Sequence, residues 1–499
     1  MKRTNFAGGL ILSGIILLSL ASCSSDTGSE RDKRPNIVLI VSDDHGMMDA
    51  GCYGNSAIHT PNIDRLAANG IRLTRAHCTS ASCSASRSVI LTGLYNHANG
   101  QYGHHHGVHH FRTFDDVRSL PVMLSDAGYE TVRIGKFHVG PEKVFRFRHT
   151  LEASLRNPVA MADSCLPFLK NTQAPFFLYY ATGDPHRGGG KAEDLPWKPD
   201  RFGNRDDGYD GVEANPFQPD QVSVPPYLPD TPASRAELAQ YYQSVARLDQ
   251  GIGRLITHLK ATGNYHNSVI IYISDNGIAF PGAKTNLYDP AMRLPCIIRT
   301  PGNQNRGGTC DAMVTWADLT PTILDFAGAM TSDQGIPGKA IAAEDNPDFI
   351  QPEFSKFHGR SFREALKDPH PAGFDEIFAS HTFHEITMYY PMRVVQNRRY
   401  KLIWNVANGL SYPHASDLWS SATWQYALEK GEGKYGPRTI SEYRNRPPFE
   451  LYDMKNDSLE RTNLAGIPDY SHILAEMKDK LKSFQQRTWD PWRVKWEHE

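Results

Sequence analysis

Four short, mainly apolar runs constrain the fold of this 499-residue chain more than any other feature of its sequence. They comprise residues 36–42, 131–135, 176–181 and 268–274. Continuous apolar runs of this length are typical of strands that are buried on both faces of a parallel sheet. Helical patterns lie between them, at residues 61–69 and 235–261. The sequence therefore predicts an α/β fold in which helices flank a large, mostly parallel sheet.

Polar residues follow closely after each of these runs. They are Asp43 and Asp44, Lys136 and His138, Asp184 and His186, and Asp275 and Asn276. In open α/β sheets, ligands bind beyond the carboxyl ends of the strands. Because parallel strands end at the same edge of a sheet, we expect these polar side chains to face one crevice.

The acidic and amide side chains of this set predict a metal site. The expected ligands are Asp43, Asp44, Asp275 and Asn276. All four offer oxygen, which Ca²⁺ and Mg²⁺ prefer, whereas Zn²⁺ prefers His or Cys. Asp-Asp and Asp-Asn-Gly sequences are also common in the turn after a strand. Two such pairs at equivalent strand ends favour the metal site.

The segment at residues 82–93 has the start and stop signals of a short helix, with small polar residues first and Gly93 last. Cys83 lies near its predicted N-terminus, where backbone amides and the helix dipole favour a developing negative charge. Arg87 follows four residues later on the same helical face, so its guanidinium can bind an oxyanion beside Cys83. A small, buried and inert cysteine is the alternative interpretation.

Residues 83–87 resemble the signature of the type I sulfatases, Cys-x-(Pro or Ala)-Ser-Arg, in which the cysteine is converted to formylglycine. The resemblance continues through the polar residues that follow the four apolar runs and through Lys284. It covers essentially the whole chain after the N-terminal segment. It implies an alkaline-phosphatase-like sulfatase fold. It also implies 3-oxoalanine (formylglycine) derived from Cys83, a bound Ca²⁺ with Mg²⁺ as the alternative, and a formylglycine-maturation enzyme as a partner.

The same resemblance implies a role for each catalytic residue. These residues are Cys83, Arg87, Lys136, His138, His186 and Lys284. Cys83, as a hydrated aldehyde, supplies the nucleophile and a further metal ligand. The arginine and the two lysines neutralise the sulfate oxygens as charge spreads in the transition state. His186 protonates the leaving amine or alcohol, and His138 takes a proton from the remaining hydroxyl as sulfate leaves.

Within the family, the chain resembles the N-sulfatases that act on glucosamine, most clearly at residues 93–103, 136–142 and 384–388. This implies removal of N-linked sulfate from the non-reducing-end N-sulfoglucosamine of heparan or heparin fragments. An O-sulfatase acting on a related glycosaminoglycan sugar is the alternative. Lys284 departs from the arginine expected in the N-sulfatases and matches the lysine of most sulfatases. The candidate substrate-binding residues are Asp184, His384, Glu385 and Arg393.

Two other classes of protein share parts of this pattern. Metal-dependent phosphatases and phosphodiesterases of the same superfold would need a Ser or Thr nucleophile and His-rich zinc ligands. A glycan-binding lipoprotein with an inactive site is the other class, but every expected catalytic position is filled here.

A histidine-rich run at residues 104–110 invites a transition-metal interpretation. It contains His104, His105, His106, His109 and His110. We favour a loop at the rim of the pocket, because the strand ends already supply a site for a hard cation.

The N-terminus has the pattern of a lipoprotein signal peptide at residues 1–22, with a basic start, an apolar stretch and small residues before Cys23. An ordinary secretory signal with an incidental cysteine is the alternative. A lipid on Cys23 would be the only membrane contact, and residues 23–34 would form a polar tether. We therefore expect an exported protein, in the periplasm or on the outer membrane of a bacterium. The other six cysteines show no spacing typical of a disulfide framework.

The remaining chain is predicted to divide into a catalytic domain at residues 35–373 and a smaller α+β domain at residues 374–499. In the second part the strand patterns become shorter, and a helical stretch at residues 470–488 lies near the end. The formal charge is only −2, which predicts no nucleic-acid partner. A sulfated glycosaminoglycan must therefore be held by a local cluster of cations. The sequence leaves a homodimer open.

Overall fold

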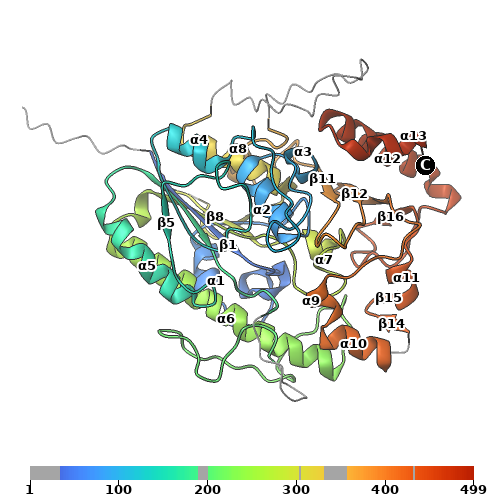
Figure 1. The fold of residues 1–499 in the computed structure, drawn as a ribbon, viewed down its shortest axis with the longest axis horizontal. Helices are drawn as coiled ribbons and strands as arrows, with labels where there is room; N and C mark the ends of the chain where they lie inside the picture. Colours follow the sequence, from blue (N-terminus) through green and yellow to red (C-terminus); the bar gives the residue numbers. More distant parts are fainter. Residues whose placement is uncertain (1–33, 189–199, 303–304, 331–356, 431–432, 499) are drawn as a thin grey trace, which may run out of the picture. The chain divides into compact units, whose positions relative to one another are not determined.

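The central feature of the computed structural model is an eight-stranded mixed sheet with the order β5-β4-β6-β1-β7-β8-β2-β9 (Figure 1). The strand bounds are β1 Asn36–Ser42, β2 Ile71–Leu73, β4 Glu130–Gly135, β5 His149–Leu151, β6 Phe176–Ala181, β7 Ser268–Ser274, β8 Cys296–Arg299 and β9 Gly308–Cys310. The four predicted runs form the adjacent strands β4, β6, β1 and β7, which are all parallel. Their carboxyl ends therefore lie along one edge, as expected.

β8 is the departure from a parallel arrangement, because it runs antiparallel to both β7 and β2. Between β7 and β8 the structure has only the short helix α7 (Asp289–Met292). A parallel return would need a longer crossover, usually a helix that packs along the sheet. The prediction of a large, mostly parallel sheet flanked by helices is confirmed, with β8 reversed.

Helices cover both faces of the sheet (Figure 1). On one face lie α1 (Pro61–Ala68), α5 (Pro158–Asn171) and α6 (Pro232–Ala261), and on the other lie α2 (Cys83–Thr92), α4 (Leu120–Asp126) and α8 (Leu319–Phe326). Alternate residues of β1 point to opposite faces of the sheet. Val38 and Ile40 pack with the helices α1, α5 and α6, whereas Ile37 and Leu39 pack with α2, α4 and α8. Burial on both faces explains why the strands are continuously apolar.

The C-terminal part contains a separate antiparallel sheet of order β11-β12-β13-β16. Its strands are β11 Glu376–His381, β12 Met392–Asn397, β13 Tyr400–Asn405 and β16 Phe449–Asp453. The helix α12 (Ser471–Arg487) packs against β12 and β13, which confirms the predicted α+β character. The other short strands and α-helices are β3 Ala76–His77, β10 Val314–Thr315, β14 Lys434–Tyr435, β15 Arg438–Thr439, α3 Asn96–Asn99, α9 Ser416–Trp419, α10 Ala422–Glu429, α11 Ile440–Arg444 and α13 Lys495–His498.

The structure describes residues 34–188, 200–302, 305–330, 357–430 and 433–498. The predicted signal peptide, Cys23 and nearly all of the predicted tether lie outside these ranges. From Arg34 onward the chain forms one compact unit, so the domain boundary after residue 373 stays a prediction. Among the described helices, none has the length and apolar character needed to span a membrane. The six described cysteines are free thiols.

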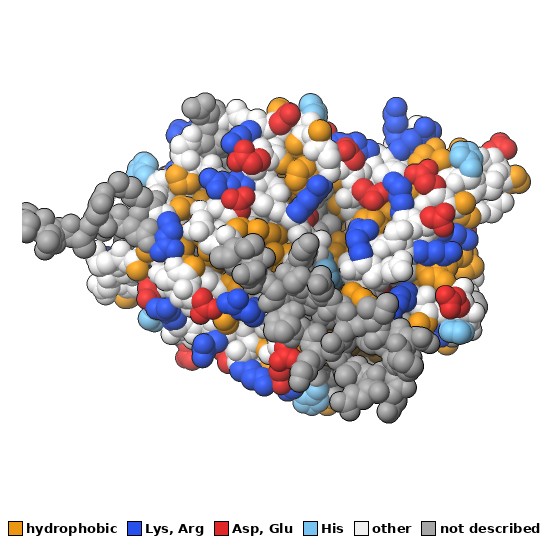
Figure 2. Space-filling view, turned by 90° about the horizontal axis from the view of Figure 1, so that it is seen from above, with side chains coloured by type: hydrophobic (Ala, Val, Ile, Leu, Met, Phe, Trp, Pro, Cys, Tyr) orange, Lys and Arg blue, Asp and Glu red, His pale blue; other side chains and the backbone are white. Residues whose placement is uncertain are grey.

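The surface carries charges of both signs. Figure 2 shows basic and acidic side chains interspersed over one face, with apolar side chains between them. This mixture agrees with the formal charge of −2 and gives that face no field of a single sign.

Candidate active site

Helix α2, which carries Cys83 as its first residue, has the bounds that its sequence signals predict. Gly93 terminates it in the left-handed conformation (φ +70°), which glycine adopts without strain. Ser82 precedes the helix, but its hydroxyl hydrogen-bonds Nδ1 of His384 over 2.9 Å instead of capping the first turn. Cys83 is fully buried, and burial raises the pKa of its thiol well above the usual value. The unmodified thiol is therefore neutral and a poor nucleophile.

Side chains from three of the predicted strand ends converge on this cysteine. Potential ligand atoms within 4.8 Å of one another come from Asp43, Asp44, Cys83 and His186. The Sγ of Cys83 lies 3.8 Å from Oδ1 of Asp44, and Nδ2 of Asn276 donates to the same oxygen over 2.6 Å. Asp275 joins the same group, because its Oδ1 accepts a hydrogen bond from the backbone amide of Asp44 over 3.1 Å. The structure thus brings together the residues that the sequence predicts at the metal site.

The donor atoms fit a hard divalent cation. Oδ1 of Asn276 is buried and has no hydrogen-bond partner in the described part of the chain, and such an oxygen is costly unless something else ligates it. Burial raises the pKa of Asp275 to about 7, although Arg87 opposes the shift. Further positive charge would keep this carboxylate ionised. The oxygens of Asp43, Asp44, Asp275 and Asn276 are therefore the set that would hold Ca²⁺ or Mg²⁺.

Each of the three carboxylates is paired with its own cation. The pairs are Lys136 with Asp43 at 2.6 Å, Lys284 with Asp44 at 3.0 Å, and Arg87 with Asp275 at 2.8 Å. Burial alone would raise the pKa of Asp43, but the charges of Lys136 and Arg87 hold it well below its usual range. The predicted sulfate-binding cations thus surround Cys83, where they can neutralise an anion.

Lys284 also contacts two further groups at this site. Its Nζ lies 3.1 Å from Nε2 of His186 and 3.0 Å from Oδ2 of Asp417. Burial, reinforced by Lys284, lowers the pKa of His186 well below its usual value, so the imidazole is neutral and accepts a hydrogen bond from the lysine. Asp417 lies in α9, and it could not be predicted as a site residue because its sequence surroundings contain no recognisable motif.

His138 contacts the histidine-rich loop that was predicted at the rim of the pocket. Its Nε2 hydrogen-bonds Nδ1 of His106, and its ring centroid lies 4.9 Å from that of His104. Nε2 of His104 lies 3.0 Å from Nε2 of His384, the residue that also holds Ser82. The loop is therefore connected to the start of α2 through imidazole contacts.

Left-handed backbone conformations gather at the same site. Asp44, His138 and Thr285 have φ values of 64°, 62° and 66°, which non-glycine residues rarely adopt. Asp44 and His138 are themselves predicted site residues, and Thr285 follows Lys284. Strained backbone of this kind is found mostly at functional sites, where the surrounding contacts hold it in place.

The four candidate substrate-binding residues have different surroundings. His384 lies beside α2, and Glu385 accepts a hydrogen bond from the Ser416 hydroxyl over 2.6 Å. Asp184 is buried and ion-paired with two arginines, Arg156 at 3.0 Å and Arg247 at 2.7 Å. Arg393 is fully buried and donates from Nη2 to Asp490 over 2.8 Å. Because a sugar could reach Asp184 or Arg393 only by disrupting a buried ion pair, the structure favours a structural role for both.

Comparison with known proteins identifies the family. A family model described as Sulfatase matches residues 35–329. The chain belongs to the sulfatase family. Human N-sulphoglucosamine sulphohydrolase is 37% identical to this sulfatase over 493 residues, which cover 96% of this chain and 93% of the human protein. The N-acetylglucosamine-6-O-sulfatase of Bacteroides thetaiotaomicron is 25% identical over 96% of this chain and 90% of its own.

Solved structures show the same fold at lower identity. One is described as a complex with its substrate D-glucosamine-2-N,6-O-disulfate, and it matches this sulfatase with a TM-score of 0.63 at 21% identity, over 92% of this chain and 98% of that one. A 2-O GAG sulfatase matches with a TM-score of 0.64 at 19% identity, over 92% of this chain and 94% of its own. The predicted alkaline-phosphatase-like sulfatase fold and the assignment as an enzyme are confirmed.

Proposed function

We propose that this sulfatase removes the N-linked sulfate from the non-reducing-end N-sulfoglucosamine of heparan or heparin fragments. The proposal rests on the similarity to human N-sulphoglucosamine sulphohydrolase, which extends over 96% of the chain. The 6-O-sulfatase that acts on N-acetylglucosamine is less similar over the same share of the chain. Both relatives act on a glucosamine derivative, and the higher identity favours the N-sulfate. An O-sulfatase on a related glycosaminoglycan sugar is the second candidate, because it would use the same catalytic residues.

The chemistry we propose begins with Cys83 converted to formylglycine and hydrated. One hydroxyl of the hydrate attacks sulfur, the S–N bond breaks, and the proton that this hydroxyl loses passes to the departing amine through the Lys284–His186 pair. His138 then removes the proton of the second hydroxyl, so that sulfate departs and the aldehyde re-forms. Arg87 and Lys136 neutralise the charge on the sulfate oxygens throughout. Ca²⁺ or Mg²⁺ would supply charge stabilisation as a Lewis acid when bound by the carboxylates.

Several further features of the proposal rest on the sequence alone. A formylglycine-maturation enzyme must act on Cys83 before the protein is active. The N-terminal pattern supports export to the periplasm or outer membrane of a bacterium, with a lipid on Cys23 as the anchor. These features predict that the protein made without a maturation enzyme folds but does not release sulfate.

The deciding experiment combines mass spectrometry of the peptide around Cys83 with two sulfate-release assays on the same sample from the native host. We expect a loss of about 18 Da, from thiol to aldehyde, and release of sulfate from N-sulfoglucosamine. A converted Cys83 with release only from 6-O-sulfated N-acetylglucosamine would move the protein to the second candidate. Active protein with an unmodified thiol would overturn the mechanism.

A further inference from the structure

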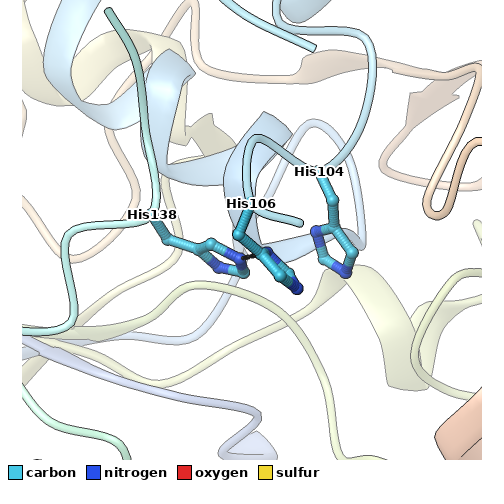
Figure 3. A group of neighbouring side chains, drawn as sticks. All are labelled: His104, His106 and His138. Atoms are coloured by element: carbon cyan, nitrogen blue, oxygen red, sulfur yellow. Dashed lines mark hydrogen bonds between the residues drawn. The ribbon is translucent and has the colours of Figure 1, made fainter. Parts of the chain in front are cut away.

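Three histidines from two segments of the chain form a compact group near α2 (Figure 3). His104 and His106 come from the histidine-rich loop, and His138 follows β4. Each offers a ring nitrogen, and the three nitrogens lie within 4.8 Å of one another. The ring centroids are 4.3 Å apart for His106 and His138, 4.8 Å for His104 and His106, and 4.9 Å for His104 and His138. The proposed reaction uses His138 but neither of the loop histidines.

Ring nitrogens in this group face one another. Nδ1 of His106 faces Nε2 of His138, and Nε2 of His104 faces Nε2 of His384 at 3.0 Å. A neutral imidazole has one N–H and one lone pair, so each nitrogen pair needs a particular tautomer on both rings. Divalent metal ions satisfy several imidazole lone pairs at once. A shared metal ion would therefore remove the need for matched tautomers in this group.

We propose that His104, His106 and His138 form a second metal site, which takes a transition-metal dication such as Zn²⁺. Imidazole nitrogen suits Zn²⁺, Cu²⁺ and Ni²⁺, whereas Ca²⁺ and Mg²⁺ prefer oxygen ligands. The two sites are therefore selective for different ions. Three protein ligands leave the fourth tetrahedral position for water or for Nε2 of His384.

An ion can reach this site from solvent. His106 is an exposed residue, whereas His104 is buried and His138 is half-buried. The site therefore has one ligand at the surface and one at its base. Glu385 is the carboxylate that interacts electrostatically with His106, and its negative charge would favour a dication there.

Occupancy of the site would inhibit the enzyme. This consequence rests on the proposed function, in which His138 removes a proton as sulfate leaves. A ring nitrogen that ligates Zn²⁺ has no lone pair for that proton, and the ion fixes the ring against the loop. Zn²⁺ binding and sulfate release are therefore expected to exclude each other.

The test uses the full chain in the presence of excess Ca²⁺, with Zn²⁺ binding measured by calorimetry and Co²⁺ binding by visible absorption. The test variant is His106→Asn, which removes the exposed ligand. The matched control is His110→Asn, because His110 is exposed in the same loop and its left-handed backbone (φ 54°) suits asparagine. We expect one Zn²⁺ per chain, with affinity lowered at least about tenfold in His106→Asn and unchanged in His110→Asn. Tetrahedral Co²⁺ absorption should be lost only in His106→Asn.

Inhibition is measured on the same proteins. The Zn²⁺ concentration that halves turnover, measured against each protein's own turnover without Zn²⁺, should rise at least about tenfold in His106→Asn and stay that of the wild type in His110→Asn. Equal Zn²⁺ affinity in all three proteins would overturn the site. Binding that depends on His106 but leaves turnover unchanged would overturn the inhibitory role. If none of the proteins hydrolyses N-sulfoglucosamine although mass spectrometry shows that Cys83 is converted, the proposed function fails, and the calorimetry and Co²⁺ absorption still decide whether the site exists.

Discussion

Arg87 and Arg393 are both fully buried, and each forms an ion pair with an aspartate, but their surroundings differ. Arg87 pairs with Asp275 in a group that also contains two further carboxylates and two lysines. Arg393 pairs with Asp490, and its Nη1 donates to the backbone carbonyls of His381 and Met392. Arg87 is therefore part of a dense cluster of charges, whereas Arg393 forms an isolated ion pair inside the C-terminal part.

The pKa values of the two aspartates show what this difference means. Burial raises the pKa of Asp275 to about 7, because the neighbouring carboxylates add to the burial and outweigh Arg87. Burial would also raise the pKa of Asp490, but Arg393 and His97 hold it well below its usual range. Asp490 is thus fully neutralised by the protein, whereas Asp275 needs more positive charge to remain ionised. Of these two buried Arg–Asp pairs, that at the candidate metal site is the one whose carboxyl keeps a raised pKa despite its arginine.

The largest expected effect is on stability, at the buried ion pair between Arg393 and Asp490. Asp490→Asn leaves the Arg393 guanidinium buried without its counter-ion, so we expect a loss of about 3–5 kcal/mol in the free energy of unfolding, measured by urea denaturation. Because the folded-state pKa of Asp490 is lowered, its contribution is present at neutral pH and is lost as the pH falls below about 4. The difference between the variant and the wild type should therefore shrink in acid.

A matched control for this variant is Asp375→Asn. Asp375 also pairs with an arginine, Arg398, but more than half of its side chain is exposed (55%). We expect a change of no more than about 1 kcal/mol, because solvent screens the pair. If both variants lose the same stability, burial is not what distinguishes the Arg393 pair.

The next effect is on catalysis, at the charge cluster. Arg87→Gln removes a cation that the proposal places on the sulfate oxygens, so we expect sulfate release to fall by about 10²–10³-fold, or about 2.7–4 kcal/mol in the barrier. The measurement is kcat/KM for N-sulfoglucosamine, and circular dichroism checks that the variant is folded. A loss of less than tenfold would show that Arg87, like Arg393, mainly stabilises the fold.

The four central strands of the sheet and most residues of the charge cluster could be predicted from the sequence, and the reason is physical. Strands buried on both faces must be continuously apolar, so β1 and β7 are visible in the sequence, and the polar residues after them must lie at one edge. The reversed strand β8 has no such signal, because a four-residue strand with three apolar residues does not indicate its own direction. Its direction depends on the length of the preceding connection.

The assignments of Arg393 and Asp417 show where sequence patterns fail. Arg393 lies in β12, and polarity alone could not tell a sugar contact from the buried partner of Asp490, which is 97 residues away. Asp417 reaches Lys284 from 133 residues away. Both contacts depend on how the C-terminal sheet and its loops pack, which a local pattern does not record.

The smaller expected effect on catalysis tests Asp417 as a positioning residue. Asp417→Ala removes one of the two carboxylates that hold Lys284, while Asp44 remains 3.0 Å from the same Nζ. We expect kcat/KM for N-sulfoglucosamine to fall about tenfold, or about 1.4 kcal/mol, because the lysine is still charged but less well placed. Asp417→Asn keeps a hydrogen-bond acceptor and should recover part of the loss. If Asp417→Ala instead lost as much activity as Arg87→Gln, Lys284 would depend on Asp417 rather than on Asp44 for its place in the site.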